Sequence, residues 1–245
     1  MLLTVDIGNS NIKFGVFDRN ELVDTIRVET YDDTTWQKAI DNFDCIKGVS
    51  LVSVVPSVSQ KMISYLNTRG VNQKNILIAS PIMENTGVYF ESSGVNPKEL
   101  GADLFVNAIA NHHLFKRRVL SVDLGTASKF CVIEKDGLYK GTTIVPGMKI
   151  ALDALLKRAP LLPKIPFEPT EKIINNTTVP CLQSGIFYGY CSLVDGLIKK
   201  IKKEQGNLYV ILTGGIGAVL HQFLEEIDEY NPNLTLQGAH ILYRM

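Results

Sequence analysis

Residues 1–18, MLLTVDIGNSNIKFGVFD, carry the clearest indication of the protein's architecture. Its first seven residues are apolar and rich in strand formers, Gly8-Asn9-Ser10 has the composition of a turn, and the return run alternates between two faces. A second turn at 18–20 leads into ELVDTIRVE at 21–29, which has the composition of a third strand. Three strands joined by tight turns predict an antiparallel meander at the start of an α/β fold.

The segments after this meander predict helices and a parallel strand. Residues 34–43 place apolar side chains at helical spacing. The β-branched run KGVSLVSVVP at 47–56 is typical of a strand buried in a parallel sheet. A second helix over 58–70, closed by Gly70, and a strand over 74–80 follow.

The second half of the chain repeats this order. Residues 118–147, RVLSVDLGTASKFCVIEKDGLYKGTTIVPG, again predict strand, glycine turn, strand, hairpin and strand. The later predictions are a helix over 147–158, an extended proline-rich loop over 159–169, a long helix over 181–203, a strand over 207–215, a helix over 216–227 and a final strand or short helix. The repeated order predicts an internal duplication, with domains over 1–115 and 116–245.

The opening turn has the chemistry of a phosphate site. The motif consists of Asp6, Ile7, Gly8, Asn9, Ser10, Asn11, Ile12 and Lys13. An acid that ends a buried strand before a glycine-containing hairpin places backbone N–H groups and small polar side chains beside a carboxylate. Such a turn can donate to phosphate oxygens while the acid holds Mg²⁺, and Lys13 can add a charged contact. The alternative is a plain hairpin whose Asp and Asn serve turn geometry.

Two further motifs strengthen the phosphate interpretation. Asp123, Gly125 and Thr126 repeat the acid, the glycine and a hydroxyl in the second half. In Thr213-Gly214-Gly215 a strand ends in paired glycines, which allow close approach of a flat ligand such as adenine. The glycine spacing does not match the dinucleotide fingerprint. Together the three motifs predict an ATP-binding protein.

Composition restricts the remaining function classes. The chain has 25 Lys and Arg against 25 Asp and Glu, so no net field attracts nucleic acid or an anionic membrane. No apolar run reaches the length of a membrane span, and the N-terminal residues lack the basic segment of a signal peptide. The four cysteines have no metal-ligand spacing, which favours a reducing, cytoplasmic setting.

The three motifs, in this order, resemble those of the superfamily of acetate and sugar kinases, heat-shock ATPases and actin. That resemblance implies two duplicated ribonuclease H-like domains with ATP in the cleft between them. Over nearly its whole length the chain resembles the type III pantothenate kinase family. The segments that carry this resemblance are DIGNSNIKFGVFD, NPKELGAD, VDLGTAS, IVPG, NTTVPCLQSGIFYGY, LVDGL, LTGG and NPNLTLQG.

The family resemblance implies transfer of the ATP γ-phosphoryl group to the primary hydroxyl of pantothenate, which begins coenzyme A synthesis. It assigns Asp103 as the catalytic base, Asp6 as support for the Mg²⁺–phosphate assembly and Thr126 as an ATP contact. Asp123 resembles the family's ligand for a monovalent cation, K⁺ or NH₄⁺.

The same resemblance implies a substrate site made by two subunits. Gly101, Ala102, Asp103 and Leu104 correspond to the family's substrate-binding motif, and Thr178 matches a threonine that reaches pantothenate, commonly from the neighbouring subunit. A homodimer is therefore expected.

The chain departs from the family pattern at three positions. Leu104 replaces an arginine that helps to hold the substrate, Gly94 replaces a frequent tyrosine, and Lys129 stands where a second threonine is usual. Leucine donates no hydrogen bond to a carboxylate, so one hypothesis is that Lys129 supplies the missing charge. Two alternatives stay open, namely a non-catalytic regulator that resembles the Bvg accessory factors and a kinase of a small alcohol without a carboxylate. Asp195, on the long predicted helix, is either a structural acid or a second base.

Overall fold

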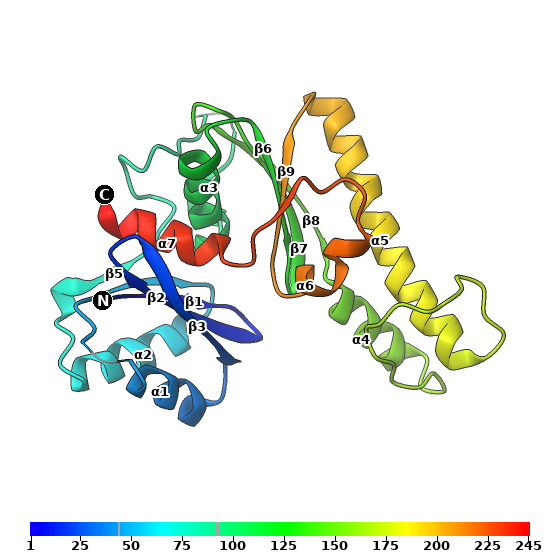
Figure 1. Cartoon of the computed structure of the whole chain (residues 1–245), viewed down its shortest axis with the longest axis horizontal. Coiled ribbons are helices and arrows are strands. Elements are labelled where there is room, and N and C mark those ends of the chain that lie inside the picture. Colours follow the sequence, from blue (N-terminus) through cyan, green and yellow to red (C-terminus); the bar gives the residue numbers. More distant parts are fainter. Residues whose placement is uncertain (44, 92–93) are drawn as a thin grey trace. The chain divides into compact units, whose positions relative to one another are not determined.

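The computed structural model describes residues 1–43, 45–91 and 94–245. Figure 1 shows its helices and strands along the chain.

The chain forms two compact units, and the first is built from three separate segments. Unit 1 comprises Met1–Arg117, Ile133–Gly141 and Asn233–Met245, and unit 2 comprises Arg118–Val132 and Thr142–Pro232. The predicted division after residue 115 lies beside the Arg117/Arg118 boundary, but the C-terminal segment belongs with the N-terminal half.

The sheet of unit 1 has the strand order β3-β2-β1-β4-β5. Its strands are β1 (Leu2–Ile7), β2 (Asn11–Asp18), β3 (Glu21–Glu29), β4 (Gly48–Ser53) and β5 (Ile76–Ile78). β2 is antiparallel to both β1 and β3, whereas β4 is parallel to β1 and to β5. The predicted meander and the predicted parallel strand are both confirmed.

Helices cover both faces of this sheet. They are α1 (Asp33–Asp41), α2 (Pro56–Thr68), α3 (Ala102–Phe115) and α7 (Leu234–Arg244), with short 3-10 turns η1 (Gln73–Asn75) and η2 (Pro97–Glu99). Val5 of β1 packs in one core with Trp36 of α1 and Met62 of α2. On the other face Leu2 packs against Leu236 of α7. Figure 1 shows α1 and α2 on one side of this sheet and α7 on the other.

The C-terminal segment is a helix, one of the two predicted alternatives, and it is fitted closely to α3. Gly238 of α7 faces Val106 of α3, and a Cβ at position 238 would overlap the Val106 carbonyl oxygen. His240 of the same helix stacks on Phe17 with ring centroids 4.3 Å apart. Its Nε2 lies 2.7 Å from the carbonyl oxygen of Arg19. These contacts explain why the last residues belong to unit 1.

The second sheet repeats the strand order of the first. Its strands are β6 (Val119–Leu124), β7 (Ala127–Ile133), β8 (Tyr139–Pro146), β9 (Tyr209–Thr213) and β10 (Glu229–Tyr230). The order β8-β7-β6-β9-β10 matches β3-β2-β1-β4-β5, and β9 is parallel to both β6 and β10. The predicted duplicated α/β fold is thereby confirmed.

One long helix dominates unit 2. The helices are α4 (Met148–Arg158), α5 (Thr178–Gln205) and the single turn α6 (Gly217–Leu220), followed by a 3-10 turn η3 (His221–Phe223). Val122 of β6 packs in one core with Phe187 and Val194 of α5. The helix predicted over 216–227 is wrong in its extent, since helical structure ends at residue 223.

We predict that Gly238→Ala lowers the free energy of unfolding by about 1–3 kcal/mol, because the added methyl group forces α7 away from α3. Gly196→Ala is the matched control. Gly196 lies in the interior of α5 and a Cβ there meets nothing within 4 Å. That variant should gain roughly 0.5–1 kcal/mol from the better helix propensity of alanine. Urea unfolding measures both, and equal effects of the two variants would contradict the close contact.

Candidate active site

The first predicted phosphate turn is a closed hairpin whose backbone is fixed by hydrogen bonds from Thr30. The Gly8 N–H donates to the Asn11 carbonyl oxygen at 3.0 Å. Thr30, fully buried at the end of β3, donates from its Oγ1 to the Gly8 carbonyl oxygen at 2.7 Å and from its N–H to the Ser10 carbonyl oxygen at 3.2 Å. Asn9 and Ser10 are exposed at the tip. The turn therefore has a fixed backbone and an accessible polar tip.

Asp6 and Lys13 lie opposite each other across this hairpin, in the antiparallel register of β1 and β2. The neighbours Val5 and Ile7 face α1 and α2, so Asp6 faces the other side of the sheet. Lys13 Nζ donates to Asn233 Oδ1 at 2.7 Å. Burial lowers the pKa of Lys13, nearby Arg27 lowers it further, and Asp6 acts in the opposite direction. A carboxylate and an amine are thus fixed beside the turn.

The start of α3 lies at the same edge of this sheet. The Val54 N–H, which follows β4, donates to the Ile7 carbonyl oxygen at 3.1 Å. A Cβ on Gly101 would lie 3.8 Å from Val54 Cγ1 and 2.6 Å from Asp103 Oδ1. The same Oδ1 accepts the Leu104 N–H at 2.8 Å. A glycine at 101 therefore makes room for the Asp103 carboxylate in the first turn of α3, where a negative charge is favoured.

Two of the predicted substrate residues are buried. Ala102 is 8% exposed and Leu104 is 7% exposed. Leu104 occupies the position where the family resemblance implies an arginine, and its aliphatic side chain lies in the interior. It contributes hydrophobic burial there and has no side-chain donor.

The second predicted phosphate turn packs against glycine residues. The Gly125 N–H donates to the Ala127 carbonyl oxygen at 3.3 Å, and the Gly147 N–H donates to the Thr126 carbonyl oxygen at 3.1 Å. A Cβ on Gly147 would overlap the carbonyl oxygens of Gly125 and Thr126. Thr126 itself is exposed. The segment IVPG therefore packs directly on the turn of VDLGTAS.

The glycine pair of the third motif meets the same turn. Gly214 has φ +89°, and a Cβ there would lie 2.5 Å from the Leu124 carbonyl oxygen and 2.6 Å from Asp123 Oδ1. The Ile216 N–H donates to that Leu124 oxygen at 3.1 Å. Asp123 and Thr213 are register partners in β6 and β9. The second and third predicted motifs and the segment IVPG are thus brought together at one edge of the second sheet.

A lysine already occupies one carboxylate oxygen of Asp123. Lys129 Nζ lies 3.2 Å from Asp123 Oδ2, and the two side chains are only 15% and 16% exposed. The second oxygen faces Gly214. An ammonium group at Oδ2 brings the charge that K⁺ or NH₄⁺ would bring. The residues present therefore do not fit the monovalent-cation site that was expected at Asp123.

Thr178 is the first residue of α5 and is exposed. The preceding loop is non-helical from residue 159 to 177, which includes the extended loop predicted over 159–169, and side chains of α5 hold it. Ser184 Oγ donates to the Ile173 carbonyl oxygen at 2.6 Å, and Tyr188 OH donates to the Thr170 carbonyl oxygen at 2.6 Å. The beginning of α5 and its loop therefore form one ordered structure.

The predicted site residues divide between the two units. Asp6, the turn at 8–11, Lys13 and the motif 101–104 belong to unit 1, whereas Asp123, Thr126 and Thr178 belong to unit 2. Among residues 1–43, 45–91 and 94–245, no group of three or more His, Cys, Asp or Glu side chains is arranged to hold a metal ion. Within the same residues, no helix is both long and apolar enough to cross a membrane.

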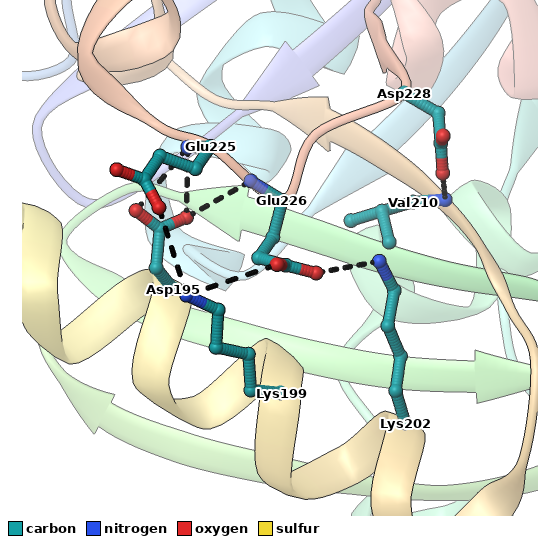
Figure 2. Close-up of polar contacts among 7 residues, drawn as sticks. All are labelled: Asp195, Lys199, Lys202, Val210, Glu225, Glu226 and Asp228. Atoms are coloured by element: carbon teal, nitrogen blue, oxygen red, sulfur yellow. Dashed lines mark hydrogen bonds and ion pairs between the residues drawn. The ribbon is translucent and has the colours of Figure 1, made fainter.

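Asp195 supports the segment that follows the third motif (Figure 2). Its Oδ1 accepts the N–H groups of Glu225 and Glu226 at 3.1 and 3.2 Å, and its Oδ2 accepts Glu225 N–H at 3.2 Å. Lys202 Nζ forms an ion pair with Glu226 Oε2 at 2.8 Å. Because Asp195 is buried and binds backbone donors, it has the structural role that was one of its two predicted interpretations. These bonds also explain why the predicted helix stops early.

Two supporting residues had no sequence signal. Thr30 fixes the first turn although it lies about twenty residues from it in the chain. Tyr190 OH hydrogen-bonds Ser128 Oγ beside the second turn and donates to the Pro146 carbonyl oxygen at 3.3 Å. Both are long-range contacts from a neighbouring element, which a single sequence does not reveal.

Comparison with known proteins gives a family match over most of the chain. The family model described as type III pantothenate kinase matches residues 2–200. A protein of Exiguobacterium sp. named type III pantothenate kinase is 34% identical over 254 aligned positions, which cover 99% of this chain and 98% of that protein.

Solved structures share the fold at lower identity. A conserved Baf family protein of Campylobacter jejuni, named as a transcriptional activator, has a TM-score of 0.62 at 18% identity and covers 99% of this chain and 98% of its own. MreB 5 of Spiroplasma citri bound to AMPPNP has a TM-score of 0.53 at 10% identity, with 99% and 96% coverage. At these identities the likeness shows a shared fold alone.

We predict that Asp195→Ala destabilises unit 2 by roughly 1–3 kcal/mol, since two backbone N–H groups lose their acceptor. Asp195→Asn, which keeps one acceptor oxygen, should lose less. Glu225→Gln changes only a side chain that is 79% exposed, so it serves as the control and should unfold like the parent protein. Thermal or urea unfolding measures all three. A loss in Asp195→Ala no larger than that of the control would contradict the structural role.

Proposed function

Because the chain belongs to the type III pantothenate kinase family, we propose that it transfers the γ-phosphoryl group of ATP to the primary hydroxyl of pantothenate in the cytoplasm, opening coenzyme A synthesis. The protein is a kinase. The observation that carries the proposal is the placement of Asp103 at the edge of the sheet that also presents Asp6 and the first phosphate turn.

In this proposal Asp103 is the general base. A carboxylate within hydrogen-bond reach of the acceptor hydroxyl takes its proton as the new phosphorus–oxygen bond forms. The fixed position of Asp103, between the backbone of Gly101 and the N–H of Leu104, supports this role because phosphoryl transfer depends chiefly on positioning.

The phosphate turns would bind ATP. The hairpin at 8–11 offers backbone and side-chain donors, with Lys13 nearby as a cation, and the exposed Thr126 offers a hydroxyl. Mg²⁺ is usually held by one or two carboxylates together with water and phosphate oxygens, so the single carboxylate of Asp6 fits it. When bound, the metal would neutralise charge on the transferred group. The adenosine would bind near the third motif, at Gly214 and Gly215.

Pantothenate would bind at the 101–104 motif, with Thr178 contributing a hydroxyl. A second candidate acceptor, a small alcohol without a carboxylate, is favoured by one observation. Leu104 is buried and cannot pair with a carboxylate, where the family resemblance implies an arginine. The two candidates differ in the acceptor and share the base.

We predict pantothenate-dependent release of ADP from MgATP, reduced at least about 100-fold by Asp103→Asn, because the amide cannot accept the proton. The measurement is coupled ADP release with and without pantothenate. The control is Asp33→Asn, a half-buried acid paired with Lys61 in the first turn of α1 of the same unit, which should keep the parent rate.

The outcomes separate the alternatives. If the protein phosphorylates uncharged primary alcohols but not pantothenate, and Asp103→Asn loses that activity, the acceptor is a small alcohol without a carboxylate. Nucleotide binding without turnover on any acceptor would refute a catalytic role and support a regulatory one.

We further propose a homodimer formed through the start of α5 and its loop. Leu161 and Ile174 in this loop are 97% and 86% exposed, which is unusual for large apolar side chains. Along α5 the small residues Cys181, Gly185 and Gly189 form an exposed row at helical spacing, which permits close helix contact. Thr178 would then lie at or near the interface, as the resemblance implies.

The test of the dimer is a charge in the apolar loop. The parent protein should have twice its 27.2 kDa chain mass in light scattering. Ile174→Glu should shift it towards the monomer, because a desolvated carboxylate opposes burial, and raise the KM for pantothenate. Ile82→Glu, at an isoleucine of unit 1 that is also exposed, is the control. A monomeric parent protein would refute the dimer.

A further inference from the structure

Each of the two phosphate turns carries a carboxylate on one strand and a lysine on the strand that returns from the turn. In unit 1 these are Asp6 and Lys13, which are cross-strand partners. In unit 2 they are Asp123 and Lys129, whose charged groups form an ion pair at 3.2 Å. The duplicated fold therefore provides each turn with an amine of its own.

Strand alternation places Lys129 on the functional face of its sheet. Phe130 packs in the core with α5, and Ser128 hydrogen-bonds Tyr190 of that helix. Lys129, between them, points to the opposite face. On β6 the neighbours Val122 and Leu124 also face the α5 core, so Asp123 lies on the same face as Lys129.

The ion pair is well suited to replace a bound ion. Both side chains are largely buried, so solvent screens their attraction weakly. A phosphate near this turn would meet the negative charge of Asp123, and the ammonium of Lys129 offsets that repulsion. A lysine ammonium and a free NH₄⁺ carry the same charge and the same kind of donor, but the tethered group is present at every moment.

We propose that Lys129 is the resident cation of the second phosphate turn, so that this kinase needs no monovalent cation there. The proposal rests on the proposed function only for its activity assay. This role differs from the earlier hypothesis that Lys129 pairs with the carboxylate of pantothenate. Loss of a resident cation would change the affinity for MgATP and its response to K⁺, whereas loss of a substrate contact would change the KM for pantothenate.

The first experiment uses the unmodified chain. ADP release with MgATP and pantothenate is measured from 0 to about 100 mM KCl or NH₄Cl, with choline chloride holding ionic strength constant. The affinity for MgATP is measured by calorimetry under the same conditions. We expect both quantities to change by less than about twofold. Activation of the parent protein by about tenfold or more on addition of K⁺ would overturn the proposal.

Two variants then locate the effect. Lys129→Ala removes the charge and leaves space, so its affinity for MgATP should fall by about tenfold or more and return on addition of K⁺ or NH₄⁺. Lys129→Met removes the charge but keeps the volume, so added salt should not restore it. Lys200→Ala removes an exposed charge of α5 and should show neither effect. Circular dichroism establishes that each variant is folded.

The readouts distinguish this proposal from the proposed function. If no acceptor is phosphorylated, the calorimetric response to K⁺ still tests Lys129. A Lys129→Ala protein with unchanged affinity for MgATP and raised KM for pantothenate would overturn the proposal in favour of a substrate contact. Loss of MgATP affinity in Lys129→Ala that neither K⁺ nor NH₄⁺ restores would also overturn it.

Discussion

The alternation of side chains along β1 and β6 is the constraint on which the rest of the structure depends. Each central strand must bury apolar side chains against helices, which fixes the direction of every second residue. The residues in between are then free to carry chemistry, and both strands place an aspartate there, Asp6 and Asp123. A shift of one residue in either strand would turn its apolar side chains away from the helices and its aspartate into the core. The packing of the hydrophobic core therefore fixes both carboxylates at their turns.

Much of the fold could be predicted because its signals are local. Strand periodicity and glycine turns indicated the meander, the duplicated order and the two motifs, at 123–126 and 213–215, that meet beside Asp123. The misjudged elements depend on distant partners. The end of helical structure at residue 223 follows from backbone donors captured by Asp195, and α7 returns to unit 1 because Gly238 admits Val106. Neither contact has a signature in the nearby sequence.

The candidate site could be predicted in identity more readily than in electrostatics. Motif composition indicated the turns and the family resemblance pointed to Asp103, but which charge faces which carboxylate depends on side-chain direction across strands. The sequence suggests Lys129 as a substitute for the missing arginine, whereas its ion pair with Asp123 emerges from the hairpin geometry. Leu104 likewise becomes interpretable once its burial is known. A core position favours an apolar side chain, whereas a contact to a substrate carboxylate needs an accessible polar one.

The three-segment composition of unit 1 has a consequence for biosynthesis. Its helix α7, within Asn233–Met245, leaves the ribosome after every residue of unit 2. The N-terminal sheet therefore receives α7 on one of its faces only after unit 2 has been synthesised, whereas unit 2 has its whole sequence available earlier. Domains usually fold in order of synthesis. Here the unit that begins first is completed last, and the exposed face of its sheet must be tolerated in the nascent chain.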